Sequence, residues 1–292
     1  MHALLQNELP DLLPESLKIA ARAKTYLAQK TPCALITVVR TRGSVPRLAQ
    51  TCMLVTGTET VGTVGGGHLE FDAVKQARSK LHPDFETFET RYPLGAKLGQ
   101  CCGGEVVLRT EQLAAQHTQY MRQLFQDTAL PVLLFGAGHV AQALVRVLMS
   151  LPVRLTWIAV RDTENETQPA IPSSLLAQMP AHFQYTVTDT PEAELNLSAA
   201  QQARTAVVIM THQHSLDERI VATALQQNSG VAWRYLGLIG SQTKRKKFEQ
   251  RLQAQNFKNF ENLVCPIGVE GILDKSPEVV AISVAASLMT LL

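Results

Sequence analysis

The sequence predicts an α/β protein with two domains, the second built on a mostly parallel, doubly wound sheet. An apolar run at residues 132–135 leads into the turn Gly136-Ala137-Gly138 and then into apolar residues at helical spacing. This order of strand, glycine turn and helix is typical of a Rossmann-like fold. Further apolar runs at 155–160, 206–210, 235–239 and 263–265 alternate with helix-like or loop segments, as expected for parallel strands covered by helices.

The N-terminal half has the pattern of an α+β domain. Residues 14–30 and 68–81 show helical spacing, whereas 33–39, 51–55 and 59–64 have the character of strands. We expect strands 85–92 and 105–109 to pair across a glycine-rich loop, and a polar helix to follow at 112–126. These elements place an N-terminal domain at 1–118 and a Rossmann-like domain at 128–292. The segment 163–191, rich in Pro, Thr and Ser, gives no assignment.

Composition excludes several classes of protein. The 27 basic and 25 acidic residues give a net charge of +2, which offers no electrostatic basis for nucleic-acid binding. No apolar run approaches the roughly 20 residues needed to span a bilayer, and the first residues lack the pattern of a secretory signal. Five cysteines, an odd number without Cys-x-x-Cys spacing, suit a reducing compartment. We therefore expect a cytoplasmic protein without a membrane or nucleic-acid partner.

Three glycine-rich or turn segments of the N-terminal domain could bind a ligand. In the turn at 43–47, Arg47 could bind phosphate or carboxylate, or could simply close the turn. The run Gly65-Gly66-Gly67 before His68 could admit a ligand to the backbone or permit a cramped helix entry. Cys102 precedes two glycines, where backbone amides can stabilise a thiolate. Whether Cys101 or Cys102 is the functional thiol stays open.

In the second domain, ligands are expected beyond the carboxyl ends of the strands. We expect four such ends to line one crevice: 136–139, 211–217, 240–241 and 266–268. His212, His214 and Asp217 could bind a metal ion, but a polar loop before a helix capped by Ser215 explains the same residues better, so we predict no metal site.

A basic cluster follows the same domain's fourth apolar run. Lys244 and Arg245 open the helix after Ser241. Basic residues at a helix N-terminus oppose its dipole, so they indicate either a nearby anion or a solvated helix face.

Taken in order, these motifs resemble the XdhC and CoxI family of xanthine dehydrogenase accessory proteins. The resemblance implies a chaperone, without catalytic residues of its own, that binds the molybdenum cofactor (molybdopterin), assists its sulfuration, and inserts it into xanthine dehydrogenase, an enzyme of purine catabolism. The implied partners are the xanthine dehydrogenase apoenzyme, a cysteine desulfurase and a second copy in a homodimer. The candidate cofactor-binding residues are Ser44, Arg47, Gly66, Gly67, His68, Cys102, Gly136, Gly138, His139, His212, Ser241, Lys244 and Arg245.

Two positions depart from the family pattern, and two other functions remain as alternatives. Gln50 stands where the family has glycine. Ala159 stands where a ribose-binding acid belongs, about 20 residues after the glycine turn, although Asp162 could substitute. An NAD(P)-dependent oxidoreductase using the Gly136 turn is the main alternative, and Ala159 counts against NAD(P). A metal hydrolase using His212, His214 and Asp217 is the other.

Overall fold

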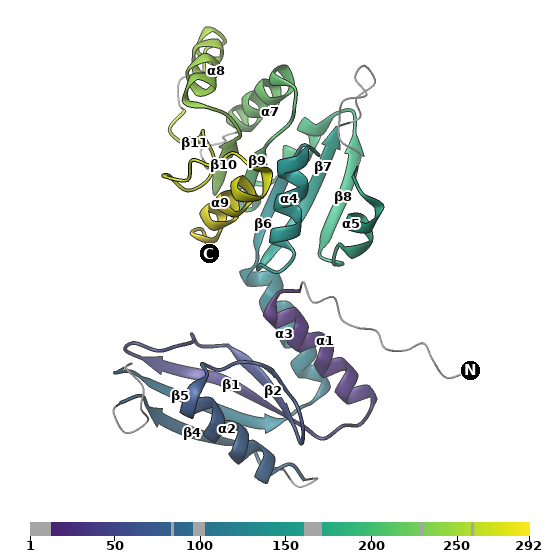
Figure 1. Cartoon of the computed structure of the whole chain (residues 1–292), viewed down its shortest axis with the longest axis vertical. Helices are drawn as coiled ribbons and strands as arrows, with labels where there is room; N and C mark the ends of the chain where they lie inside the picture. Colours follow the sequence, from purple (N-terminus) through teal and green to yellow (C-terminus); the bar gives the residue numbers. More distant parts are fainter. Residues whose placement is uncertain (1–12, 83–84, 96–102, 161–170, 228–230, 258–259) are drawn as a thin grey trace, which may run out of the picture. The chain divides into compact units, whose positions relative to one another are not determined.

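The computed structural model describes residues 13–82, 85–95, 103–160, 171–227, 231–257 and 260–292. The described chain divides into two compact units, residues 13–127 and 128–292 (Figure 1). Within these residues, no helix is both long enough and apolar enough to cross a membrane. The first unit is an antiparallel sheet with helices, and the second is a parallel sheet with helices, so the predicted fold class is confirmed.

The first unit contains a five-stranded sheet in the order β3-β2-β1-β5-β4. Its strands are β1 (Cys33–Arg42), β2 (Cys52–Thr56), β3 (Thr60–Gly62), β4 (Phe88–Pro93) and β5 (Glu105–Gln112), and its helices are α1 (Glu15–Ala28), α2 (Gly67–Ser79) and α3 (Ala115–Thr128). The pairing of β4 with β5 confirms the predicted hairpin. Helix α3 begins three residues later than the helix expected from 112, because Gln112 still pairs with Ala34 in the sheet.

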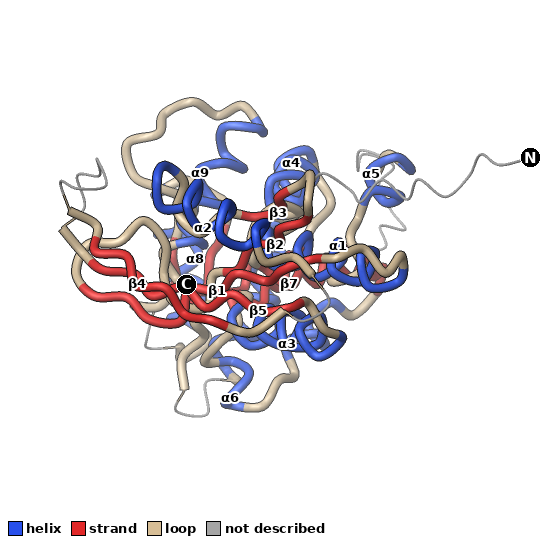
Figure 2. The backbone as a smooth tube through the Cα atoms, turned by 90° about the horizontal axis from the view of Figure 1, so that it is seen from below, coloured by secondary structure: helices blue, strands red, loops and turns tan. Residues whose placement is uncertain are grey.

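Side chains alternate along the strands of the first unit, and each face of the sheet has its own core. Ile36 and Val38 of β1 pack with Leu69 and Ala73 of α2. On the opposite face, Leu35 packs with residues of α1 and α3. Helices α2 and α3 accordingly lie on opposite sides of the strands (Figure 2). Successive side chains of β1 thus enter different cores, as the alternation of side chains along a β-strand requires.

The second unit contains a six-stranded parallel sheet in the order β11-β10-β9-β6-β7-β8. Its strands are β6 (Leu130–Phe135), β7 (Val153–Val160), β8 (Phe183–Thr188), β9 (Ala206–Ile209), β10 (Tyr235–Leu238) and β11 (Leu263–Val264). Counted from β6, this is the order 3-2-1-4-5-6 of dinucleotide-binding folds. In this order, strands are added first on one side of the first strand, and the fourth strand is then added on its other side. The switch point here is therefore between β6 and β9.

Helices cover both faces of the parallel sheet. They are α4 (His139–Leu148), α5 (Ser173–Gln178), α6 (Ala199–Gln202), α7 (His214–Gln226), α8 (Gln242–Ala254) and α9 (Pro277–Met289), with a short 3₁₀ helix η2 at Pro191–Leu195. Leu144 of α4 and Val284 of α9 share one core cluster, whereas Ile220 of α7 and Phe248 of α8 belong to the cluster on the other face. Figure 1 shows α4 and α9 side by side.

Strand β8 and helix α5 lie in the segment 163–191, where the sequence pattern predicts no element. The sheet therefore has six strands where we expected five. Among the described strands, β8 lies at the edge of the sheet and pairs with β7 alone, from Leu155↔Phe183 to Val160↔Thr188. Phe183 is its only fully buried residue, so it lacks the continuous apolar run that identifies a central parallel strand.

Candidate functional site

The triple glycine of the first unit forms a turn that binds one of the protein's own carboxylates. Gly65, Gly66 and Gly67 have φ values of 136°, 71° and 60°, a region that residues with a Cβ rarely adopt. Glu70 Oε2 accepts hydrogen bonds from the N–H groups of Val64 (3.0 Å) and Gly66 (3.1 Å), and from the hydroxyl of Thr63. A negative charge at the start of α2 is favourable. The turn thus has the character of an anion site, and Glu70 occupies part of it.

Three loops of the first unit come together at one end of its sheet. A Cβ added to Gly104 would lie 2.2 Å from the carbonyl oxygen of Ser44, and one added to Gly65 would lie 2.5 Å from Pro46 Cγ. Both positions therefore require glycine. The contacts join the segments 43–47, 65–67 and 103–104, which the sequence had singled out separately. Cys101 and Cys102 lie outside the described residues, and the described chain resumes at the exposed Gly103.

Arg47 and His68 have different environments in this group of loops. Arg47 Nη2 contacts Glu15 Oε2 of α1 at 3.0 Å and Glu15 Oε1 at 3.1 Å, which agrees with the interpretation of Arg47 as a residue that closes the turn. His68, in the first turn of α2, is exposed, and its ring centroid lies 6.4 Å from that of Phe71. Ser44 is also exposed. Ser44 and His68 are thus accessible polar side chains of these loops.

In the second unit, the glycine turn after β6 lies at the switch point. Gly136 has φ = 109°, and a Cβ there would lie 2.4 Å from the carbonyl oxygen of Met210, just after β9. Trp157 Nε1 donates a hydrogen bond to the Gly136 carbonyl at 2.7 Å. Gly136 therefore permits close packing of β6 against the end of β9. Gly138 instead has no atom of the described chain within 4 Å of its Cβ position, and His139 beside it is exposed, so this end of the turn is open with respect to those residues.

Ala159 is 4% exposed and belongs to a core cluster of the second unit. The position where a dinucleotide-binding fold carries a ribose-binding acid is therefore apolar and buried. Asp162, the possible substitute, lies outside the described residues.

Asp217 is the centre of a buried polar cluster after β9. Its side chain is 0% exposed. Oδ1 accepts hydrogen bonds from the N–H (3.2 Å) and hydroxyl (2.6 Å) of Thr211, and Oδ2 lies 2.6 Å from Lys244 Nζ. His212 and His214 are exposed. No three His, Cys, Asp or Glu side chains within the described ranges are arranged to hold a metal ion.

The expected Ser215 cap is wrong. Helix α7 begins at His214 with Gln213 at the N-cap position, and Ser215 lies inside the first turn. The Asp217 carboxylate instead binds back to Thr211, the residue that leaves the strand. In the sequence, this contact corresponds to a threonine and an aspartate separated by five residues, a wider spacing than that of a helix capping box.

The basic residues after β10 are also held by partners. Ser241 caps α8, since its hydroxyl accepts from the N–H of Lys244 at 3.2 Å. Lys244 Nζ, besides Asp217, donates to the Ile239 carbonyl at 2.9 Å. Arg245 pairs with Glu249 one turn along α8 at 2.8 Å. Lys244 therefore joins the turns that follow β9 and β10, while Arg245 supports its own helix.

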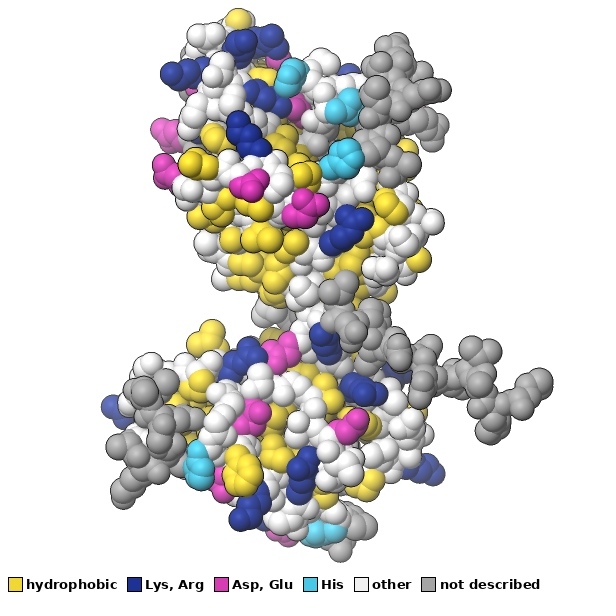
Figure 3. Space-filling view, in the orientation of Figure 1, with side chains coloured by type: hydrophobic (Ala, Val, Ile, Leu, Met, Phe, Trp, Pro, Cys, Tyr) yellow, Lys and Arg dark blue, Asp and Glu magenta, His cyan; other side chains and the backbone are white. Residues whose placement is uncertain are grey.

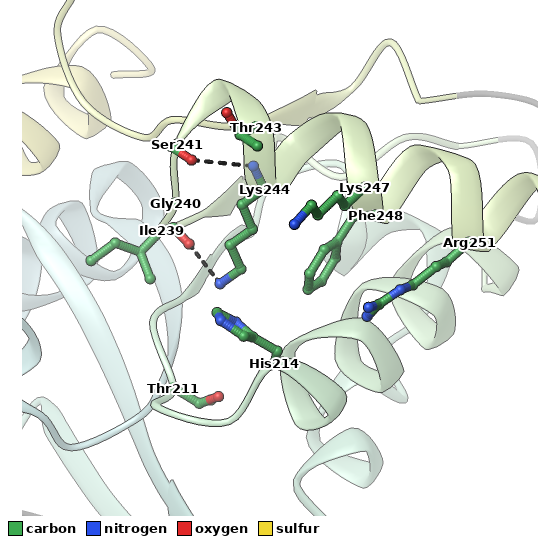
Figure 4. A pocket seen from close by; sticks show the side chains of 10 residues that line it. All are labelled: Thr211, His214, Ile239, Gly240, Ser241, Thr243, Lys244, Lys247, Phe248 and Arg251. Atoms are coloured by element: carbon green, nitrogen blue, oxygen red, sulfur yellow. Dashed lines mark hydrogen bonds between the residues drawn. The ribbon is translucent and has the colours of Figure 1, made fainter.

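A cavity of about 550 Å³ opens at these two strand ends (Figure 4). It is lined by Thr211, His214, Ile239, Gly240, Ser241, Thr243, Lys244, Lys247, Phe248 and Arg251. Lys244, Lys247 and Arg251 follow one face of α8, and His214 faces them from α7. Lys247 and Arg251 are not among the residues predicted above, although spacings of three and four residues place them on one helical face with Lys244.

Comparison with known proteins identifies the family. Residues 132–288 match a family model described as the XdhC Rossmann domain, and residues 26–89 match one described as the XdhC and CoxI family. A crystal structure of a xanthine dehydrogenase from Bacillus halodurans has a similar fold, with a TM-score of 0.69 and 18% identity over 93% of this chain and 95% of that chain. No curated protein matches the sequence. The ordered motifs and the matches in both units show that this chain belongs to the XdhC and CoxI family.

Proposed function

We propose that this protein is an accessory protein for the maturation of xanthine dehydrogenase, and that it binds the molybdenum cofactor, assists its sulfuration and delivers it to the apoenzyme. Membership of the family supports the maturation role. The observation that carries cofactor binding is the meeting of the segments 43–47, 65–67 and 103–104 at one end of the first sheet. Glycine-rich backbone and exposed polar side chains meet there.

The residues of these loops fit an anionic cofactor. Ser44 and His68 are exposed and can donate hydrogen bonds. Cys102 directly precedes Gly103 in the sequence. Its thiolate would bind the metal of the cofactor. Arg47 would contribute indirectly, because its guanidinium already holds Glu15. The cofactor itself would supply the redox-active metal, whereas these residues would bind and orient it.

The proposed partners follow from the same role. They are the xanthine dehydrogenase apoenzyme, a cysteine desulfurase that supplies sulfur, and a second copy of this chain, all in the cytoplasm. On this proposal the protein turns over no substrate. We propose no role for NAD(P), since the buried Ala159 provides no acid for a ribose.

The test is reconstitution of apo-xanthine dehydrogenase with cofactor in the presence and absence of this protein. Wild type should raise the yield of active enzyme, and Cys102→Ala should lower that gain. Cys265→Ala is the matched control, because Cys265 is a buried thiol of the second unit. Equal yields with and without the wild-type protein would overturn the proposal. An effect of Cys265→Ala as large as that of Cys102→Ala would remove the role of Cys102.

A further inference from the structure

We propose that the cavity at the ends of β9 and β10 binds a small molecule through a phosphate monoester. This site lies where β9 and β10 end, on the β9 side of the switch point, and none of its lining residues belongs to the glycine turn itself. The proposal goes beyond the chaperone function and does not depend on cofactor binding by the first unit. It rests on the cavity, on the cations that line it and on the helix ends that open onto it.

Two of the three lining cations have N–H groups available for a ligand. Lys244 is neutralised by Asp217 at 2.6 Å. Arg251 contacts Glu218 through Nη1 at 3.2 Å and has 58% of its side chain exposed, so most of the five guanidinium N–H groups remain for other acceptors. Lys247 is exposed and forms no ion pair with the residues that the structure describes.

Helix ends add donors to the same cavity. The first amides of a helix have no intrahelical partner, and Thr243, in the first turn of α8, lines the cavity, whereas Ser241 caps that helix through the N–H of Lys244. His214 starts α7 and also lines the cavity, and the side chain at the N-cap position of that helix, Gln213, forms no capping hydrogen bond. Both helix dipoles therefore favour an anion at this point. Without one, the basic residues of the first turns of α8 oppose its dipole.

The size and lining of the cavity indicate an organic phosphate in preference to an inorganic ion. A volume of about 550 Å³ lies within the range of roughly 300–1,000 Å³ of small-molecule pockets. Ile239 is partly exposed and supplies apolar surface beside the cations, and the largely buried Phe248 lies in the cavity wall behind it. A phosphate would contact Lys247 and Arg251, and the organic part would contact the apolar side chains. Space-filling views show Lys and Arg side chains gathered at this end of the second unit (Figure 3).

The test is calorimetric titration of the cofactor-free protein with AMP, ribose 5-phosphate and adenosine. AMP should bind, adenosine should bind much more weakly, and AMP affinity should fall with added salt because exposed charges are screened. Ribose 5-phosphate shows how much of the AMP affinity comes from the base. Absence of binding by both phosphates, or equal affinity for AMP and adenosine, would overturn the proposal.

Two neighbouring lysines provide a matched pair of variants. Lys247→Ala removes a cavity-lining charge, and Lys246→Ala removes the same charge from an exposed position outside the lining. Loss of a charged hydrogen bond should weaken AMP binding about tenfold or more in Lys247→Ala, with little change in Lys246→Ala. Equal weakening in both variants would show only general electrostatic attraction and would refute the site. Cys102→Ala should bind AMP normally, which separates this proposal from the chaperone function.

Discussion

Replacement of Asp217 by asparagine should destabilise the second unit by about 3 kcal/mol or more. The side chain of Asp217 is 0% exposed and that of Lys244 is 14% exposed, so neither charge gains much hydration when its partner is removed. Asparagine has the same shape and can still accept from Thr211, but it leaves the ammonium of Lys244 without a counter-charge. Removing one partner of a buried ion pair costs about 3–5 kcal/mol. The partial exposure of Lys244 places the expected loss near the lower value.

Urea unfolding monitored by tryptophan fluorescence measures this loss of stability in the second unit. The chain has two tryptophans, Trp157 and Trp233, and both are buried in the second unit. Each kcal/mol lost should lower the melting temperature of a unit of this size by roughly 2–4 °C. The expected decrease in Asp217→Asn is therefore at least about 6 °C.

Two further variants control for simpler explanations. Glu249→Gln breaks the Arg245–Glu249 pair, which lies within one helix near the surface, and should cost no more than about 0.5 kcal/mol. Adding Lys244→Met to Asp217→Asn removes both buried charges and should restore part of the stability. If Asp217→Asn costs no more than Glu249→Gln, the Asp217–Lys244 pair is effectively solvated and the reasoning fails.

Three other predictions follow from local geometry and burial. Gly136→Ala should cost at least about 2 kcal/mol in the same urea assay, because φ is positive and Met210 blocks the Cβ, whereas Gly138→Ala should change stability by less than about 1 kcal/mol; equal effects would contradict the packing role of Gly136. Burial raises the pKa of the Cys33 thiol to about 12, so mass spectrometry after alkylation of the native protein near neutral pH should find it unmodified, and rapid modification would contradict its burial. Burial lowers the pKa of His182 to about 4 from 6.5, so the unfolded state binds more protons and stability present above pH 6.5 should be lost as pH falls towards 4. His182→Phe should flatten that dependence, and an unchanged slope would assign it to another group.

The elements that could be predicted from sequence are those whose signal is local. The strand, turn and helix around Gly136 combine an apolar run, glycines and helical spacing within about 20 residues, and the structure confirms them. β8 escaped prediction because an edge strand of a parallel sheet is covered on fewer sides, so most of its residues can be polar. Its assignment depends on pairing with β7, a contact that local patterns do not encode.

In the candidate site too, residue types can be recognised from local sequence, whereas their contacts depend on the tertiary fold. Lys244 and Asp217 were both noticed in the sequence, but as an anion contact and a possible metal ligand. They are 27 residues apart, and their pairing follows from the neighbouring positions of β9 and β10 in the sheet. In the first unit, Glu70 returns to the amides of Val64 and Gly66. In both cases a side chain of the protein pairs with a group that, from the sequence alone, is expected to bind a ligand.

The pairing of Asp217 with Lys244 also links stability to ligand binding, with effects of opposite sign. Asp217 removes one positive charge from the lining of the cavity because it neutralises Lys244. Asp217→Asn should therefore tighten the binding of AMP while it lowers the stability of the second unit. Calorimetry below the onset of unfolding can measure the first effect, and the fluorescence assay measures the second. Weaker AMP binding in Asp217→Asn would instead show that the carboxylate is needed to hold the two turns in place, since Asp217 contacts Thr211 of one turn and Lys244 of the other.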